Sequence, residues 1–140
     1  MGVHDYLLMT RFFTTVGHLT ATLILFQTIS NNVSLSLSDN ASSQEVQIAY
    51  QTAMGALAFS LLCFLVDVFG AVSGSSTFSV SINLMQILFH FIGGIFLSWL
   101  ITDNWNYQAL WPIVISSNLP TALAELFQLL VVKVFRAGVF

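Results

Sequence analysis

The sequence predicts an all-α integral membrane protein, a bundle of four transmembrane helices with both termini in the cytoplasm. Three observations support this: 56% of the 140 residues are hydrophobic, only 6% are charged, and the apolar residues fall into four long runs. A soluble domain carries about a quarter charged residues, so this chain has too few to cover a surface in contact with water. About 20 predominantly apolar residues are needed to cross the hydrocarbon of a bilayer, and each run is long enough.

The four predicted spans form a single membrane domain. They cover residues 10–29, 48–72, 80–102 and 109–135. A Ser/Asn-rich outer loop, 30–47, separates the first two, and the later breaks read SGSSTFS and DNWNYQ. Turn-forming residues and loss of hydrophobicity coincide at each break, which is typical of the ends of membrane helices.

Two features of the spans need explanation. The first span is longer than the apolar core of a cleaved signal peptide, about 7–15 residues, so we expect it to be retained as a signal anchor. Pro120 lies inside the fourth span and predicts a kink there. A membrane helix tolerates such a proline because neighbouring groups satisfy the freed carbonyl.

The orientation follows from the basic residues Arg11, Lys133 and Arg136, which all flank the same side after four crossings. The positive-inside rule places that side, and therefore both termini, in the cytoplasm. The two N-x-S/T sequons, at Asn32 and Asn40, then lie in the outer loop. Both are candidate N-glycosylation sites, and their occupancy stays open.

Each span carries one stripe of small or polar residues at helical spacing, and its other faces are aliphatic or aromatic. The stripes are Arg11, Thr15, His18 and Thr22; Ala53, Ala56, Ser60, Cys63, Asp67, Gly70 and Gly74; Ser79, Asn83, Gln86, His90 and Gly93; and Asn118, Thr121, Glu125 and Gln128. Membrane helices associate through close backbone approach and side-chain hydrogen bonds, so stripes that face inward predict a compact bundle.

The ionisable residues within the spans form two predicted groups. His18, His90 and Glu125 fall near the middle of their helices, and we expect them to meet as a polar cluster in the membrane. Asp67 lies nearer the cytoplasmic end, at a depth where Arg11 could reach it, which predicts an Arg11–Asp67 pair at the inner face. The motif Gly70-x-x-x-Gly74 predicts close helix packing.

The role of the cluster has three interpretations. An ionisable group at the bilayer centre costs about 2.5–3.5 kcal/mol on insertion scales, so it requires a partner or a function. The favoured interpretation is helix packing or partner docking; a proton relay and a ligand or lipid-headgroup pocket remain alternatives. Against a relay, the four spans show no inverted repeat, and none carries a second carboxylate to continue a path.

No catalytic or cofactor-binding motif is present. The chain lacks HExxH, a nucleophile elbow and a phosphate-binding loop. Cys63 is alone, which excludes an internal disulfide and a cysteine zinc site. A net charge of −3 gives no basic surface for nucleic acid, and no small-molecule substrate is evident. We therefore expect no metal, no cofactor and no enzymatic activity.

Several segments in order resemble the transmembrane protein 107 family, from about Thr10 to Phe135. They are TRFFTTVGHL, VDVFGAVSG, NLMQILFH, DNWNYQALW and NLPTALAELF. Two departures are visible. Asp67 stands where the family leads us to expect Glu, and this shorter acid keeps the charge but reaches less far; the tail KVFRAGVF is less basic than a family tail.

The resemblance implies a non-enzymatic structural component of the ciliary transition zone membrane complex. Such a protein would support cilium assembly and the control of ciliary membrane composition. The implied partners are other transition-zone membrane proteins, of the tectonic and meckelin type, and membrane lipid. Two other classes stay open: a small transporter or channel subunit that uses the His/Glu cluster, and a lipid-interacting trafficking protein with four spans.

Overall fold

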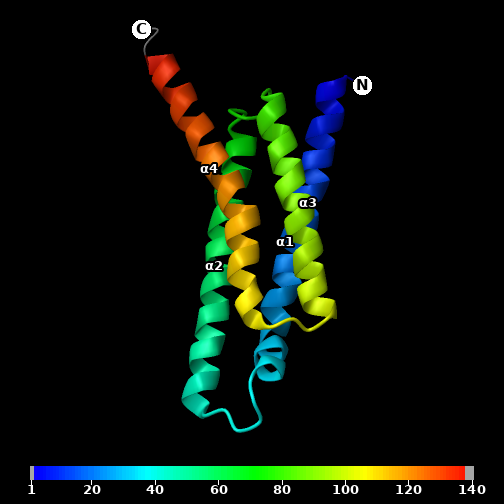
Figure 1. Cartoon of the computed structure of the whole chain (residues 1–140). Helices are drawn as coiled ribbons and strands as arrows, with labels where there is room; N and C mark the ends of the chain where they lie inside the picture. The colour runs from blue at the N-terminus through cyan, green and yellow to red at the C-terminus, as the bar shows by residue number, and fades with distance from the viewer. Residues whose placement is uncertain (1, 138–140) are drawn as a thin grey trace.

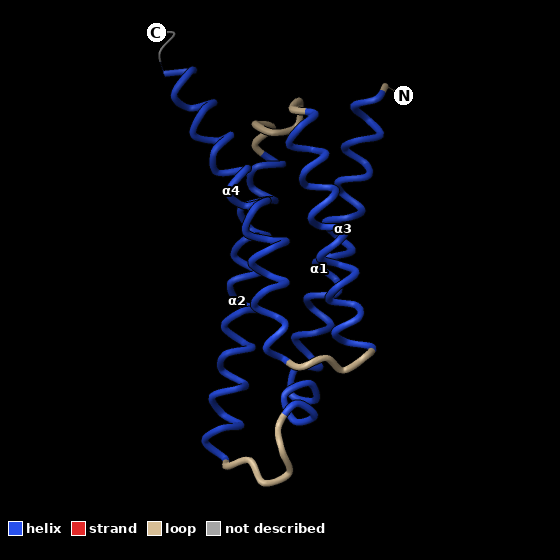
Figure 2. The backbone as a smooth tube through the Cα atoms, viewed as in Figure 1, coloured by secondary structure: helices blue, strands red, loops and turns tan. Residues whose placement is uncertain are grey.

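The computed structural model describes residues 2–137, and side chains through Val134. The described chain is helical and contains no strand (Figures 1 and 2). Its elements are α1 (Val3–Ser36), α2 (Ser43–Val72), α3 (Val80–Thr102), the short 3₁₀ helix η1 (Tyr107–Ala109) and α4 (Leu110–Ala137). Four of these are long and apolar enough to cross a membrane, which confirms the predicted fold class.

The two termini lie at the same end of the bundle, as four crossings require (Figure 1). The assignment of this end to the cytoplasm stays a prediction. It used Arg11 and Lys133, which are both described, and Arg136, whose side chain lies outside the described residues.

The first two helices extend well beyond the predicted spans. α1 has 34 residues and α2 has 30, which at about 1.5 Å per residue makes both longer than the roughly 30 Å of hydrocarbon. The predicted outer loop 30–47 is therefore wrong over most of its length, and only residues 37–42 connect the helices. Helix α2 begins there because Ser42 and Glu45 form a capping box.

The helices pack in a ring, with α1 beside α2 and α3, and α4 also beside α2 and α3. The pairs α1/α4 and α2/α3 therefore face each other across the two diagonals. The turn between α2 and α3, residues 73–79, lies at the end of the bundle that holds the termini (Figure 1). Pro120 lies inside α4, which stays packed through Glu125, and the C-terminal end of α4 leans away from the other helices (Figure 1).

The bundle interior has two different halves. The half near the 37–42 link is mainly apolar, although it also buries the side chain of Asn32. Its fully buried side chains include Leu25, Leu57, Leu97, Leu100, Leu110 and Val114. The half near the termini buries polar and charged side chains instead. Large hydrophobic residues such as Phe12, Leu65 and Phe127 are exposed on the outside, as expected of faces in contact with lipid.

Candidate functional site

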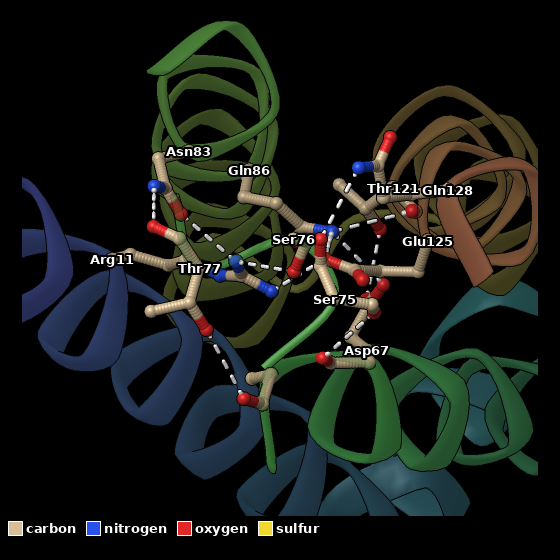
Figure 3. A network of polar contacts seen from close by, with 12 residues as sticks. Arg11, Asp67, Ser75, Ser76, Thr77, Asn83, Gln86, Thr121, Glu125 and Gln128 are labelled. Carbon is tan, nitrogen blue, oxygen red and sulfur yellow. Dashed lines mark hydrogen bonds and ion pairs between the residues drawn. The ribbon is translucent and has the colours of Figure 1, made fainter. Parts of the chain in front are cut away.

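The candidate site is a network of polar side chains that joins all four helices in the terminal half of the bundle (Figure 3). Its first element is an ion pair across the α1/α4 diagonal. Arg11 Nη2 lies 2.5 Å from Glu125 Oε1, and both side chains are buried. A charge-assisted hydrogen bond in such a dry environment is among the stronger polar contacts in a protein.

The second element crosses the other diagonal, between α2 and α3. His90 Nε2 lies 3.2 Å from Asp67 Oδ2, which is an ion-pair distance, although the ring N–H is not aligned for a hydrogen bond. Gln86 joins the two diagonals, because its Nε2 donates at 3.2 Å to both Asp67 Oδ1 and Glu125 Oε1. Thr121 adds a 2.9 Å hydrogen bond from its hydroxyl to Asp67 Oδ2.

The network ends at a pair of imidazoles. His18 Nδ1 and His90 Nδ1 are 3.1 Å apart, so one nitrogen must donate and the other accept. The ring of Phe64 stacks on His90, with centroids 5.3 Å apart and planes inclined by 15°. Gly93 makes room for His18, because a Cβ at that position would lie 2.4 Å from His18 Cε1.

The α2–α3 turn covers the terminal end of the network. Arg11 Nη1 donates to Ser76 Oγ at 3.0 Å and to Asn83 Oδ1 at 2.9 Å, so both nitrogens at its tip are bonded. Gln128 of α4 donates from Nε2 to the Ser75 carbonyl at 3.1 Å. Ser76 is fully buried, which shows that the turn folds into the bundle rather than standing above it (Figure 3).

The two predicted packing glycines have different roles. A Cβ at Gly70 would lie 2.0 Å from Glu125 Oε2, so α2 needs glycine there to accommodate the carboxylate. Gly74 has φ +73° and no atom within 4 Å of its would-be Cβ. The assignment of Gly74 to helix packing is wrong: it serves the left-handed conformation of the turn, which glycine adopts without strain.

The pairing of charges differs from the prediction. The Arg11–Asp67 pair is wrong, because Arg11 binds Glu125 and Asp67 lies against His90. Glu125 reaches the two histidines only through Gln86 and Asp67. Counting depth along separate spans assumed equal spans and a protruding turn. In the structure the turn is drawn inward, so Arg11 bonds to Ser76 of the turn and to Glu125 of α4 rather than to Asp67.

The two candidate glycosylation sites also differ. Asn32 is buried in α1, and its Nδ2 donates to the Leu100 carbonyl at 3.0 Å. That amide nitrogen would carry the glycan, so modification of Asn32 is incompatible with this packing and the prediction is wrong there. Asn40 is exposed in the 37–42 link, and its modification stays a prediction.

The prediction of site residues missed the groups that connect the charges. Gln86, Asn83 and Thr121 were placed on inward stripes but not in the site, and Ser76 was not singled out. The stripes were the available signal. A buried amide that faces two carboxylates can be recognised only when the order of helices around the bundle is known.

Among the described residues, no group of three or more His, Cys, Asp or Glu side chains could hold a metal ion. A cavity of ≈ 470 Å³ lies between α1 and α3, lined by Phe13, Gly17, Phe91, Gly94, Trp99 and both network histidines, among others. If the interpretation as a ligand or lipid-headgroup pocket applies, this cavity is where the ligand would bind. What the network itself can do chemically is to hold four helices together and to hold protons.

Comparison with known proteins agrees with this architecture. Residues 7–129 match the TMEM107 family, described as a transmembrane protein. Human Transmembrane protein 107 is 28% identical over 126 residues, 90% of each chain. The rat and mouse proteins of that name are 28% and 27% identical over 113 residues, 81% of each chain. No solved structure matches the chain. With four apolar helices and a match over most of its length, this multi-pass membrane protein belongs to the transmembrane protein 107 family.

Proposed function

We propose that this protein is a non-enzymatic structural component of the ciliary transition zone membrane complex. In this role it supports cilium assembly and the control of ciliary membrane composition. Family membership, and the role that the family resemblance implies, support the location. One observation carries the structural part: the charged side chains of the interior are buried and pair with one another across the bundle.

A catalytic role has little support in the described residues. The carboxylates of Asp67 and Glu125 and the ring of His90 are almost completely buried, and each lies against another group of the network. A general acid or base must come within hydrogen-bonding distance of a substrate, either directly or through one water. Burial between four helices denies that access to Asp67 and Glu125, and His90, which lines the cavity between α1 and α3, lies against Asp67 and His18.

Conduction across the membrane also has little support. A relay needs polar sites at successive depths, but the network occupies only the terminal half of the bundle. The other half is closed by Leu25, Leu57 and Leu97, which have no exposed surface. We therefore expect liposomes that contain the protein to show no proton or ion flux above that of empty liposomes.

The protein can therefore interact with other molecules through the outer faces of its four long helices. These faces are apolar, and the links between helices are short. Lateral contacts with membrane lipid and with other transition-zone membrane proteins, of the tectonic and meckelin type, are the proposed interactions. Helices in lipid associate by van der Waals packing and by hydrogen bonding, and the exposed aromatic and aliphatic side chains can supply the packing.

The first test is localisation. The full chain, tagged and expressed at its natural level in ciliated cells, should form a ring at the base of the cilium and co-purify with a fixed set of membrane proteins. Broad endomembrane staining with no stable partner would contradict the proposal and favour a trafficking role. Flux in the liposome assay that Glu125→Gln abolishes would favour a transporter.

A second test finds the face that meets partners. Phe12, Leu65, Leu88 and Phe127 are each more than half exposed, one on each long helix. Alanine at these positions removes contact area without disturbing the interior. We expect one or two of the variants to lose co-purification while all four keep the thermal stability of the unaltered protein. Retention of every partner by all four variants would argue against docking through these lateral faces.

The proposed orientation can be tested with the single cysteine of the chain. Because Cys63 is the single cysteine, a Cys63→Ser background contains no thiol that could react with the reagent. A cysteine introduced by Ser38→Cys in the link should react with an impermeant maleimide added outside intact cells. One introduced by His4→Cys should react only after permeabilisation. The reverse pattern would place the termini outside.

A further inference from the structure

With Arg11 protonated and both carboxylates ionised, the charges of the polar network do not sum to zero. It contains one guanidinium, from Arg11, and two carboxylates, from Asp67 and Glu125, all buried. One positive and two negative charges leave one negative charge uncompensated. An unpaired charge inside a membrane protein costs several kcal/mol, so a further positive charge or proton is needed there.

The titratable groups that face this centre can be counted helix by helix. α1 contributes Arg11 and His18, α2 contributes Cys63 and Asp67, α3 contributes His90, and α4 contributes Glu125. No other titratable side chain that the structure describes is buried, and the described Lys133 is exposed. Among the side chains that the structure describes, a proton on one of these groups is therefore the available source of the missing positive charge.

His90 has the geometry to carry it. Its Nε2 faces Asp67 Oδ2 at 3.2 Å, and its Nδ1 faces His18 Nδ1 at 3.1 Å. An imidazolium has a proton on each nitrogen, so one would lie within ion-pair distance of the carboxylate, although out of line for a hydrogen bond, and the other would point to His18. A neutral ring protonated at Nδ1 would turn a lone pair toward Asp67. A neutral ring protonated at Nε2 would leave the centre with its unbalanced charge.

The surroundings of His90 support the charged form. The face of Phe64 stacks on the His90 ring at 5.3 Å, within the distance over which a cation is attracted to an aromatic face. His18 must then accept at Nδ1 and carry its own proton on Nε2. That atom is buried without a hydrogen-bond partner, so this arrangement leaves one N–H donor unsatisfied.

We infer that the bundle binds one proton at the junction of His18, His90 and Asp67, carried by His90 as an imidazolium. Each diagonal of the bundle then holds one cation and one anion: Arg11 with Glu125, and His90 with Asp67. The interior is neutral as a whole, and the contact of α2 with α3 depends on the bound proton. This inference does not depend on the ciliary role.

Nitrogen-15 NMR of the histidine side chains tests it directly. The chain has three histidines, and the exposed His4 can be replaced by His4→Asn, which leaves only the network pair. In lipid nanodiscs at pH 7 we expect one ring to be protonated on both nitrogens and the other to be neutral. Asp67→Asn removes the carboxylate that the imidazolium balances, so the imidazolium signal should be lost.

The His4→Asn spectrum at pH 7 shows whether one network histidine is an imidazolium, even if Asp67→Asn fails to fold. Two neutral rings would overturn the inference. An infrared band from a protonated carboxyl group that disappears in Asp67→Asn would overturn the placement on His90, because the proton would then reside on Asp67. An imidazolium that persists in a folded Asp67→Asn variant would contradict the pairing with this carboxylate.

Discussion

Replacing Gly70 by alanine should destabilise the bundle far more than the addition of one methyl group suggests. The new Cβ would lie 2.0 Å from Glu125 Oε2, 2.6 Å from Cδ and 3.0 Å from Cγ. A free side chain would swing away from such a contact. Glu125 cannot do so cheaply, because Arg11 and Gln86 hold its other oxygen.

The magnitude follows from competing terms. Overpacking a closed interior costs about 1–3 kcal/mol. Replacing glycine by alanine within a helix returns up to about 1 kcal/mol. If Glu125 shifts but keeps Arg11, the net loss should be about 1–2 kcal/mol; if the ion pair breaks, the loss rises toward the roughly 3–5 kcal/mol typical of a broken buried pair.

The matched control is Gly17→Ala. Gly17 also lies inside a long helix, but a Cβ there meets no atom within 4 Å. This variant should be neutral or slightly more stable. The free energy of unfolding can be measured in mixed micelles by titration with sodium dodecyl sulfate, with the fluorescence of the three tryptophans as the signal.

A double-mutant cycle makes the test specific. In a Glu125→Ala background the atoms that collide with the new Cβ are absent, so Gly70→Ala should cost almost nothing there. An equal cost of Gly70→Ala in both backgrounds, or a cost no larger than that of Gly17→Ala, would refute the steric explanation.

Three other predictions concern features outside this contact. Arg11→Met should lower the free energy of unfolding by about 3–5 kcal/mol because it strands Glu125, whereas Arg11→Met with Glu125→Met should recover most of it; no recovery would contradict the pairing. Any endoglycosidase-sensitive shift of the protein on a gel should disappear in Asn40→Gln and persist in Asn32→Gln, and the opposite result would contradict the burial of Asn32. Ser42→Ala in unglycosylated protein should cost about 1 kcal/mol at the start of α2, measured as faster amide hydrogen exchange in its first turn, while Ser42→Thr should keep most of the protection.

Much of the fold could be predicted because hydropathy and helix length are properties of contiguous sequence. The number of crossings and the bounds of α3 came directly from the apolar runs. The C-terminal end of α1 and the start of α2 were misjudged, since Ser and Asn residues look like a loop when their contacts are unknown, whereas the end of α2 at Val72 was predicted correctly. Asn32 is helical and buried because it bonds to α3, a partner that local sequence does not reveal.

The polar network could be predicted in part, for a related reason. Helical spacing placed His18, His90, Asp67 and Glu125 on inward stripes, and all four are buried. Which side chain meets which depends on the order of helices around the ring and on their relative heights. The inward turn at Ser76 changed those heights, and no feature of the turn sequence indicated it.

The sequence separation of the ion pair has a consequence for biosynthesis. Arg11 and Glu125 are 114 positions apart, one in the first helix and the other in the last. While the ribosome is still translating, the guanidinium has entered the membrane before its counter-ion exists. A prematurely terminated chain would therefore present a stranded cation, a chemical mark by which quality-control machinery could distinguish an incomplete product from a finished one.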